Sequence, residues 1–440
     1  MFSFRAMVLL CLSCGAMLFH SPLPLQAQAG QGQPVDALLK RLSAPKPVDR
    51  VVALIEIGTL GPRAASAVPT LVRLFDDPDP DVAQEAAKAL GKIGDAALGA
   101  LLARSDSRDR RVRRLAVAAL AVGKCDRKRT VPVFLRALRD QDEDVRGEAV
   151  SGLGNSRDQA ALAPLIAVLR RDPSYQVRQQ AASAFGQFGP AGRAAIPALI
   201  DVLKKEEEKD TFESRSLCSR IVDSLFGIGP DSIPSLTILL QSRKKYPFAC
   251  DRTLSVLRQF AFQDPKLLRK PLPVLREILG EPGARQELVL RILEVMKQEA
   301  KDALPDIMAL LPVAPNLEKT FAAAALYSIT GSAKQPVSIL VEVTRSKSAG
   351  DRFNAVRRLG EIGRPASAAL PLLIRLCNDP DPNVRLAAVQ ELPNIDNASA
   401  RVFEAIEARL EDPDQSVSRA AEMSLEKMQP AKKEEKEPKK

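Results

Sequence analysis

One pattern recurs along this 440-residue chain and constrains its fold more than any other feature. An apolar segment ends in an acidic turn that contains proline, and a second apolar segment follows. The clearest copy is AVPTLVRLFDDPDPDVAQEAAKALGKIG, which begins at Ala67. Close copies begin at Ala163 and Leu370. A pattern that repeats in this way predicts stacked copies of one small unit rather than a single globular core.

Both apolar segments of this unit are predicted to be helices. Leu71 and Phe75 share one helix face because they lie four residues apart. The prolines of the turn end that helix, and Asp79 or Asp81 can cap the next helix. The residues expected on the inward face of the second helix are Val82, Ala86, Ala89, Leu90 and Ile93. The glycines expected after its last turn are Gly91 and Gly94.

The repeats predict an all-α fold, an α-solenoid of about twelve stacked helical hairpins over residues 30–429. First-helix prolines recur mostly 31 to 39 residues apart, at Pro69, Pro132, Pro164, Pro197, Pro234, Pro273, Pro305, Pro336 and Pro371. Second helices are predicted to start near Arg50, Val82, Val112, Val145, Val177, Cys218, Cys250, Arg285, Lys319, Arg352, Val384 and Val417. The expected caps are Val35 to Gly61 and Phe403 to Met428.

The second helices share the motif Asp-Val-Arg-x-x-Ala-x-x-x-Leu-Gly. Its fullest copy is Asp144-Val145-Arg146-Gly147-Glu148-Ala149 with Leu153-Gly154. This motif resembles the HEAT repeat, and the period of ~33 residues resembles the short HEAT-like subclass first associated with phycobilisome lyases. The resemblance covers nearly all of Val35 to Met428 and implies the helical superhelix of that family. It implies no catalytic residue, because the likeness lies in the repeat motif alone.

The two ends of the chain are predicted to lie outside the repeats. Residues 1–29 are expected to form a cleavable secretory signal: Arg5 is their one charged residue, an apolar run follows, and Ala27-Gln28-Ala29 is a cleavage signal. The mature protein is then periplasmic or extracellular, with a formal charge of +9 once Arg5 is removed from the total of +10. Retention of residues 1–29 as a membrane anchor is the alternative. Residues 430–440 are expected to form a charged, disordered tail.

The residue types present argue against an ordinary hydrolase. His20 is the one histidine, and it lies in the predicted signal, so the mature chain lacks a histidine base or metal ligand. The turn carboxylates are interpreted as helix caps. We therefore predict no catalytic, cofactor-binding or metal-binding residues.

One position early in the second helices is mostly basic. These residues are Arg50, Arg113, Arg146, Arg178, Arg285, Lys319, Arg352 and Arg385. They are predicted to form a structural ladder in which each binds a turn aspartate, such as Asp140 or Asp172. A basic rail for an anionic partner is the alternative interpretation.

The fifth and sixth predicted pairs depart from this pattern. Cys218 and Cys250 replace the basic residue, and they are expected to be free buried thiols unless the helices rotate enough to bring them into disulfide range. The same pairs have lengthened turns, which in a solenoid emerge on one edge. The candidate partner contacts in these turns are Lys204, Lys205, Lys209, Arg243, Lys244 and Lys245.

The function predicted from these features is a non-enzymatic, exported scaffold that binds a protein through the concave surface of its second helices. The surface is expected to include Lys88, Lys92, Arg114, Glu148, Gln179, Gln180, Arg357 and Gln390. One alternative is an enzyme or enzyme subunit of the bilin-lyase-like class, and another is a basic nucleic-acid binder. Export and an aromatic content of 4% argue against nucleic acid. The charge of the mature chain also suits an anionic cell surface. The sequence leaves the partner and the oligomeric state open.

Overall fold

Acidic turns and helix caps set the boundaries of the helices in this protein. A computed structural model describes residues 35–123 and 125–428, and those residues form helices and turns without a strand. In the repeat that begins at Ala67, Asp79 accepts the backbone N–H groups of Asp81 and Val82, and Pro80 is the first helical residue. Of the two candidates from the sequence, Asp79 and Asp81, the capping residue is therefore Asp79. The predicted signal at 1–29 and the tail at 430–440 lie outside the described residues.

The described residues form twelve pairs of a first and a second helix, as predicted. The first helices are α2 (Val35–Arg41), α4 (Val68–Arg73), α6 (Asp95–Arg104), α8 (Arg127–Ala137), α10 (Leu162–Arg171), α12 (Ile196–Glu207), α14 (Ile233–Gln241), α16 (Leu272–Leu279), α18 (Leu304–Leu310), α20 (Lys334–Val343), α22 (Leu370–Leu376) and α24 (Ala400–Glu407). The second helices are α3 (Pro47–Leu60), α5 (Pro80–Ile93), α7 (Arg110–Val122), α9 (Glu143–Ser156), α11 (Tyr175–Gln187), α13 (Phe212–Ile228), α15 (Pro247–Gln263), α17 (Arg285–Met296), α19 (Asn316–Thr330), α21 (Ala349–Ile362), α23 (Pro382–Ile395) and α25 (Gln415–Lys427).

Short 3₁₀ helices join many of these elements. They are η1 (Gly61–Ala67), η2 (Leu74–Asp76), η3 (Gln159–Ala161), η4 (Gly189–Ala195), η5 (Pro230–Ser232), η6 (Pro265–Leu268), η7 (Lys297–Ala303) and η8 (Arg364–Ala369). Several of the connecting or first helices carry proline in their first turn, where the missing N–H has no intrahelical partner to lose.

Of the two glycines near the end of α5, one has its predicted role and one does not. Gly94 ends the helix with φ of 76°, as expected of a C-terminal glycine. Gly91 was expected after the last turn but lies inside α5. A Cβ at Gly91 would stand 2.7 Å from the carbonyl oxygen of Ala119 on α7. Gly91 is therefore a site of close helix packing, because a larger residue would push α7 away.

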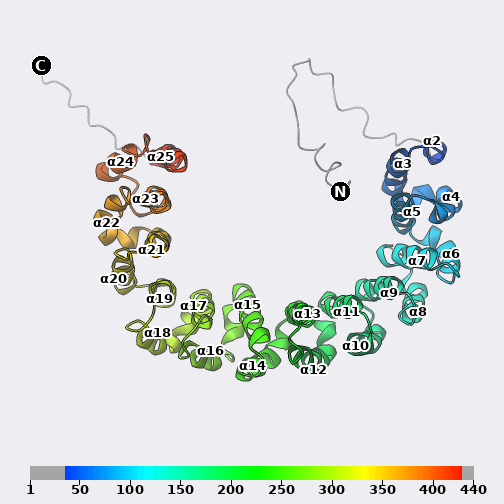
Figure 1. Cartoon of the computed structure of the whole chain (residues 1–440), viewed down its shortest axis with the longest axis horizontal. Helices are drawn as coiled ribbons and strands as arrows, with labels where there is room; N and C mark the ends of the chain where they lie inside the picture. The colour runs from blue at the N-terminus through cyan, green and yellow to red at the C-terminus, as the bar shows by residue number, and fades with distance from the viewer. Residues whose placement is uncertain (1–34, 124, 429–440) are drawn as a thin grey trace, which may run out of the picture. The chain divides into compact units, whose positions relative to one another are not determined.

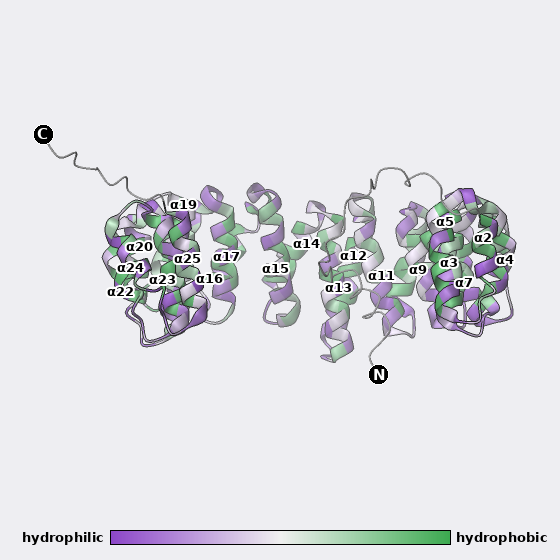
Figure 2. Cartoon of the chain, turned by 90° about the horizontal axis from the view of Figure 1, so that it is seen from above, coloured by the Kyte–Doolittle hydropathy of each residue, from purple (hydrophilic) through white to green (hydrophobic). Residues whose placement is uncertain are grey.

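The described helices group into two compact units, one on each side of a boundary between residues 133 and 134. In the described part of the second unit, the second helices from α9 to α25 lie side by side along the inner side of a curved row, and the first helices from α10 to α24 lie outside them (Figure 1). Hydrophobic and hydrophilic residues both occur along single helices such as α15 and α17 (Figure 2). Each helix therefore has an apolar side to bury and a polar side to expose.

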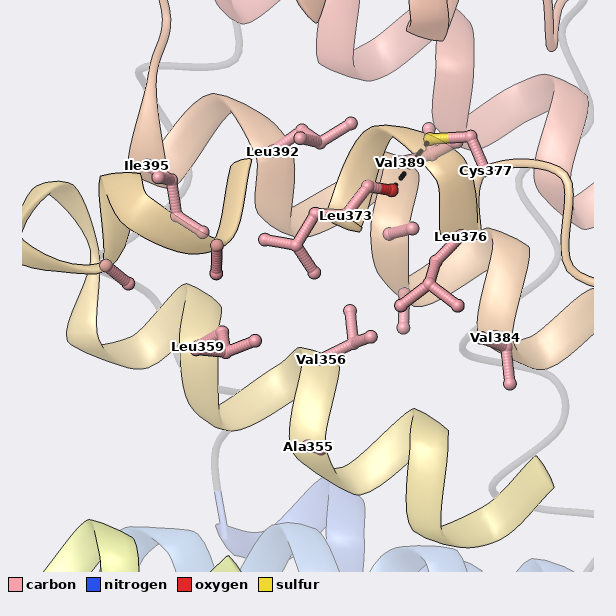
Figure 3. Close-up of a cluster of buried hydrophobic side chains, with 14 of the residues drawn as sticks. Ala355, Val356, Leu359, Leu373, Leu376, Cys377, Val384, Val389, Leu392 and Ile395 are labelled. Atoms are coloured by element: carbon pink, nitrogen blue, oxygen red, sulfur yellow. Dashed lines mark hydrogen bonds between the residues drawn. The ribbon is translucent and has the colours of Figure 1, made fainter. Parts of the chain in front are cut away.

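The core of the second unit lies between its two rows of helices. Near the C-terminal end, Val356 and Leu359 of α21 point toward Leu373 and Leu376 of α22 (Figure 3). The thiol of Cys377 donates to the carbonyl oxygen of Leu373 at 3.7 Å. Leu, Val and Ala side chains of neighbouring repeats thus share one continuous core, and no pair buries its apolar face alone.

One stretch of the described residues, Pro47–Asp76, is long and apolar enough to cross a membrane by length and composition. It comprises α3, η1, α4 and η2, and Gly61 breaks its axis with φ of 55°. Leu54 and Ile57 in this stretch are fully buried in the first unit. Burial in a helical core accounts for only part of its apolar character, since Val52 and Ile55 are 41% and 43% exposed.

Candidate functional site

A buried arginine near the start of α9 ties that helix to two turns. The Arg146 guanidinium donates to the two oxygens of the Asp172 carboxylate, at 2.8 and 2.9 Å. Its third nitrogen donates to the carbonyls of Asp140 and Gln141 in the preceding turn, at 3.0 and 3.1 Å. Asp172 also accepts the N–H of Ser174, which caps α11. Arg146 thereby fixes its own turn and the next one, and the bond to Asp172 raises the pKa of its guanidinium.

Three further arginines make the same kind of contact. Each donates to a carboxylate 27 residues further along the chain and to carbonyls five and six residues back. The pairs are Arg50 with Asp77, Arg352 with Asp379, and Arg385 with Asp412. Arg113 donates to the carbonyls of Ser107 and Arg108 in its own turn. We refer to these contacts as the arginine ladder.

Arg178 has a glutamate in place of the ladder aspartate. Its guanidinium donates to the carbonyl of Asp172 at 2.9 Å, lies 3.6 Å from Glu206 and stacks 3.9 Å from the centre of the Tyr175 ring. Glu206 is buried and also accepts from Lys209 at 2.7 Å. The residues around the fifth repeat therefore bond in a variant of the ladder.

Arg285 and Lys319 depart from the predicted ladder. Arg285 donates backward to Asp251 on α15, at 2.5 Å, and Lys319 lies 3.4 Å from Glu342 on α20. The turns that should supply their partners, residues 311–315 and 344–348, contain no acidic residue. The sequence contains the basic residue at both positions, but it lacks the acidic residue in the following turn that the ladder requires.

Cys218 and Cys250 are free, buried thiols, as expected. Their sulfurs donate to the carbonyl oxygens of Leu203 and Leu239, at 3.6 and 3.3 Å. Burial raises the pKa of both thiols to about 12. At neutral pH both thiols are protonated, so neither is a nucleophile.

The lengthened connections consist largely of helix rather than of loop. α12 continues to Glu207, and α13 and α15 have 17 residues each. The Glu207 carboxylate accepts the N–H groups of Phe248 and Ala249 at the start of α15, the nearest at 2.7 Å. Burial raises the pKa of Glu207 despite these bonds. The inserted residues therefore connect neighbouring repeats.

Most of the six basic residues predicted as partner contacts bond within the chain. Arg243 is buried and donates to Glu281 at 2.7 Å, and Lys204 lies 5.9 Å from the centre of the Tyr246 ring. Lys244 is exposed. The hydrogen bond from Arg243 lowers the pKa of Glu281, and the positive charge of Lys244 lowers it further. The remaining pairs are Lys205 with Asp201, Lys209 with Glu206, and Lys245 with Glu208. These contacts give the segment a structural role, and partner binding there stays a prediction.

A polar groove of about 260 Å³ lies across α9, α11 and α13. We call it the glutamine groove, and its lining is Ser151, Gln176, Gln179, Gln180, Ser183, Ala184, Gln187 and Arg220. The sequence prediction included Gln179 and Gln180. It missed Gln176 and Gln187, although their spacing from Gln180 places all three on one side of a helix.

Small residues in the neighbouring helices make room for these glutamines. A Cβ at Gly147 of α9 would stand 2.4 Å from Oε1 of Gln180, and one at Gly154 would stand 2.5 Å from Oε1 of Gln187. The glutamines of α11 therefore extend over the glycines of α9. The Gln180 Oε1 atom is buried and has no hydrogen-bond partner among the described residues. An acceptor of this kind gains a bond when its amide turns toward a donor in the groove.

The other residues predicted for this surface have mixed surroundings. Lys88 binds Glu85 at 2.8 Å, and Arg357 binds Glu391. Lys92 and Gln390 are exposed, and Arg114 and Glu148 are half-buried. The second-helix surface is polar at these positions, and the charges of Lys88 and Arg357 are balanced by local ion pairs.

Stacked antiparallel helix pairs, joined by an arginine ladder from one repeat to the next turn, define an α-solenoid repeat protein. The chain belongs to the HEAT repeat family. The family description "HEAT repeats" matches residues 35–121, 100–184, 131–216 and 337–426, which together cover more than half of the chain.

The chain is similar in sequence to a known protein and similar in fold to several solved structures. A protein named phycobilisome maturation protein, from Synechococcus elongatus, is 28% identical over 181 residues, 38% of this chain and 86% of that protein. Crystal structures of a Kap121p mutant and of Kap121p bound to RanGTP match with TM-scores of 0.60 and 0.59, at 14% and 13% identity. Each match covers 90% of this chain and 48% of Kap121p, so the chain spans about half the length of that protein. At this identity the likeness shows the fold alone.

Proposed function

We propose that this protein is a non-enzymatic, exported scaffold that binds an extended polypeptide segment of a partner in the glutamine groove. The observation that carries the proposal is the row of glutamine amides on α11, which includes a buried acceptor that has no partner within residues 35–123 and 125–428. The HEAT repeat fold is consistent with this role because it displays a long row of second helices.

The chemistry of the groove matches a peptide main chain. Each glutamine amide offers two donors and an acceptor, and each residue of an extended chain offers one donor and one acceptor. From Gln176 to Gln187 the helix rises about 16 Å at ~1.5 Å per residue, a length that an extended chain covers in about five residues. A volume of about 260 Å³ is also small for a drug-sized ligand, whose pockets measure roughly 300–1,000 Å³.

Charge in the groove favours a neutral or mildly acidic segment. Arg220, from α13, is the charged residue of the lining and is exposed. Main-chain recognition tolerates many sequences, so an acidic side chain placed against Arg220 would add selectivity.

The proposal of a non-enzymatic role rests on the chain's own side chains. The single histidine, His20, lies before the described residues. Within 35–123 and 125–428, no three His, Cys, Asp or Glu side chains gather in a way that would hold a metal ion. The buried thiols are held protonated by raised pKa values.

Crosslinking tests the groove directly. A photo-crosslinking residue at Gln179 should capture a protein from the native extracytoplasmic fraction. Capture should be lost when Gln176, Gln180 and Gln187 are all changed to alanine, and it should persist in Gln241→Ala, an exposed glutamine on first helix α14. Unchanged capture by the triple variant would rule out the groove as the binding site.

Export has a separate test. Protein recovered from the periplasm or medium should begin at Gly30, the residue after the predicted cleavage point. Recovery in the cytoplasm with residues 1–29 intact would contradict the export proposal and would reopen nucleic acid as a partner.

A second candidate function is an enzyme or enzyme subunit in pigment–protein maturation. It is favoured by the relative named phycobilisome maturation protein. Protein purified from its native source should then carry a coloured ligand, which absorption spectroscopy would detect. A colourless protein with a stoichiometric protein partner would favour the scaffold.

A further inference from the structure

A second pocket lies at the C-terminal ends of α15 and α17, beside α19. Its volume is about 460 Å³, within the range of roughly 300–1,000 Å³ typical of ligand sites. Its walls are Ala261, Phe262, Pro265 and Val295, with the polar residues Arg258, Glu294, Lys297 and Ser328. Phe262 is 64% exposed. An apolar wall with an exposed aromatic ring and several convergent polar groups is the usual composition of a binding site.

Lys297 occupies a backbone position that other repeats give to glycine. It ends α17 with φ of 51° and ψ of −134°. The residues that end α3, α5, α13 and α21 in the same region are Gly61, Gly94, Gly229 and Gly363. Side chains with a Cβ are strained there. Strain of this kind persists where the surrounding structure holds the backbone in place, and it is frequent at functional positions.

The positive charges of the pocket are not cancelled by its carboxylate. Arg258 lies 5.2 Å from the centre of the Phe262 ring, and its Nε–H is buried without a hydrogen-bond partner among the described residues. Glu294 is held by Arg358, at 2.9 Å. Lys297 is exposed. The pocket therefore presents a guanidinium and an ammonium beside an aromatic ring.

We propose that this pocket binds a carboxylate joined to an aromatic or branched aliphatic group. The guanidinium of Arg258 and the ammonium of Lys297 bind the carboxylate, and Phe262 and Val295 cover the apolar group. Two sources share this chemistry: the last residue of a polypeptide, and a free carboxylic acid. The pocket is distinct from the glutamine groove, so this inference does not depend on the proposed function.

The test uses three probes with the purified full chain. Isothermal titration calorimetry measures binding of the peptide acetyl-Gly-Ala-Phe with a free C-terminus, of the same peptide as its C-terminal amide, and of 3-phenylpropanoate. The free-carboxylate peptide should bind with Kd between about 10 µM and 1 mM, and the amide about tenfold more weakly. Comparable binding of 3-phenylpropanoate would assign the source as a free acid, and its absence would assign a polypeptide C-terminus.

Lys297→Gly separates a binding role from a structural one. The variant should melt about 2 °C higher because the strain is relieved, and it should bind the free-carboxylate peptide about tenfold more weakly. Phe262→Ser should also weaken binding, whereas Arg220→Met in the glutamine groove should not. Equal affinity for acid and amide, absence of binding by both peptides and 3-phenylpropanoate, or unchanged affinity in Lys297→Gly would each overturn the proposal.

Discussion

Replacing Arg146 with methionine tests whether the arginine ladder stabilises the repeats. The change keeps most of the apolar length of the side chain but removes four hydrogen bonds. It leaves the Asp172 carboxylate, 4% exposed, with the N–H of Ser174 as its remaining bond described above. Removal of one partner from a buried ion pair costs ~3–5 kcal/mol. We expect about 3 kcal/mol here, because Asp172 keeps that backbone bond.

Native-state hydrogen exchange is the suitable assay, because repeat arrays open locally rather than all at once. Amides of α9 and α11 should lose about 3 kcal/mol of protection in Arg146→Met. Arg285→Met is the matched control, since the Arg285 and Asp251 side chains are 26% and 54% exposed, and such pairs contribute below ~1 kcal/mol. The double variant Arg146→Met with Asp172→Asn should regain part of the loss, because it leaves no unpaired buried charge.

Two results would refute this reasoning about the ladder. One is a loss in Arg146→Met no larger than that in the Arg285→Met control. The other is a double variant as unstable as the sum of its single variants, because paired sites must couple. Either result would mean that apolar packing alone sets the register between repeats.

Three further predictions concern packing, thiol chemistry and pH. Gly227→Ala should lower stability by ~1–3 kcal/mol in thermal melts, since the new Cβ would stand 2.8 Å from the backbone of α11, whereas Gly99→Ala, which meets open space in α6, should raise stability by about 1 kcal/mol. In protein lacking residues 1–29, a maleimide at pH 7 should label the half-exposed Cys125 before the three buried thiols, whose pKa values are raised to about 12, and mass spectrometry at successive times would show the order. The hydrogen bond from Arg385 lowers the pKa of Asp412 in the folded protein, so the Asp412 carboxylate binds a proton more readily in the unfolded state. The contribution of Asp412 to the free energy of unfolding is therefore full above the ordinary aspartate pKa of ~3.9 and is lost as pH falls below it. The stability difference between the native protein and Asp412→Asn, measured by urea unfolding, should therefore shrink from pH 6 to pH 3.

Much of the fold could be predicted because each helix pair carries its own signals. Proline, turn aspartate and apolar spacing recur in most of the units, so a signal missing from one repeat is supplied by its neighbours. Gly91 was misplaced because a glycine that ends a helix and a glycine that admits another helix give the same letter in the sequence. The distinction depends on α7, which lies in the next repeat.

The candidate sites were harder to predict because they depend on contacts between repeats. Gln187 gains its significance from Gly154 of α9, which lets this glutamine extend across that helix. The basic residues of the lengthened turns suggested a binding edge, but their carboxylate partners lie in other turns of the helix or in adjacent repeats. Composition alone does not show which charges are already paired.

The distribution of the ladder sets which repeats can be exchanged or multiplied. The repeat around α23 supplies Arg385 to Asp412 in the following turn, and its own turn residue Asp379 receives Arg352 from the preceding second helix. A duplicated copy of such a unit would find complementary groups at both of its joints. The repeats from α13 to α17 use individual contacts instead, such as Glu207 with the start of α15 and Arg243 with Glu281. An array of this kind can grow by duplication near its C-terminal end, while the order of its middle repeats is fixed.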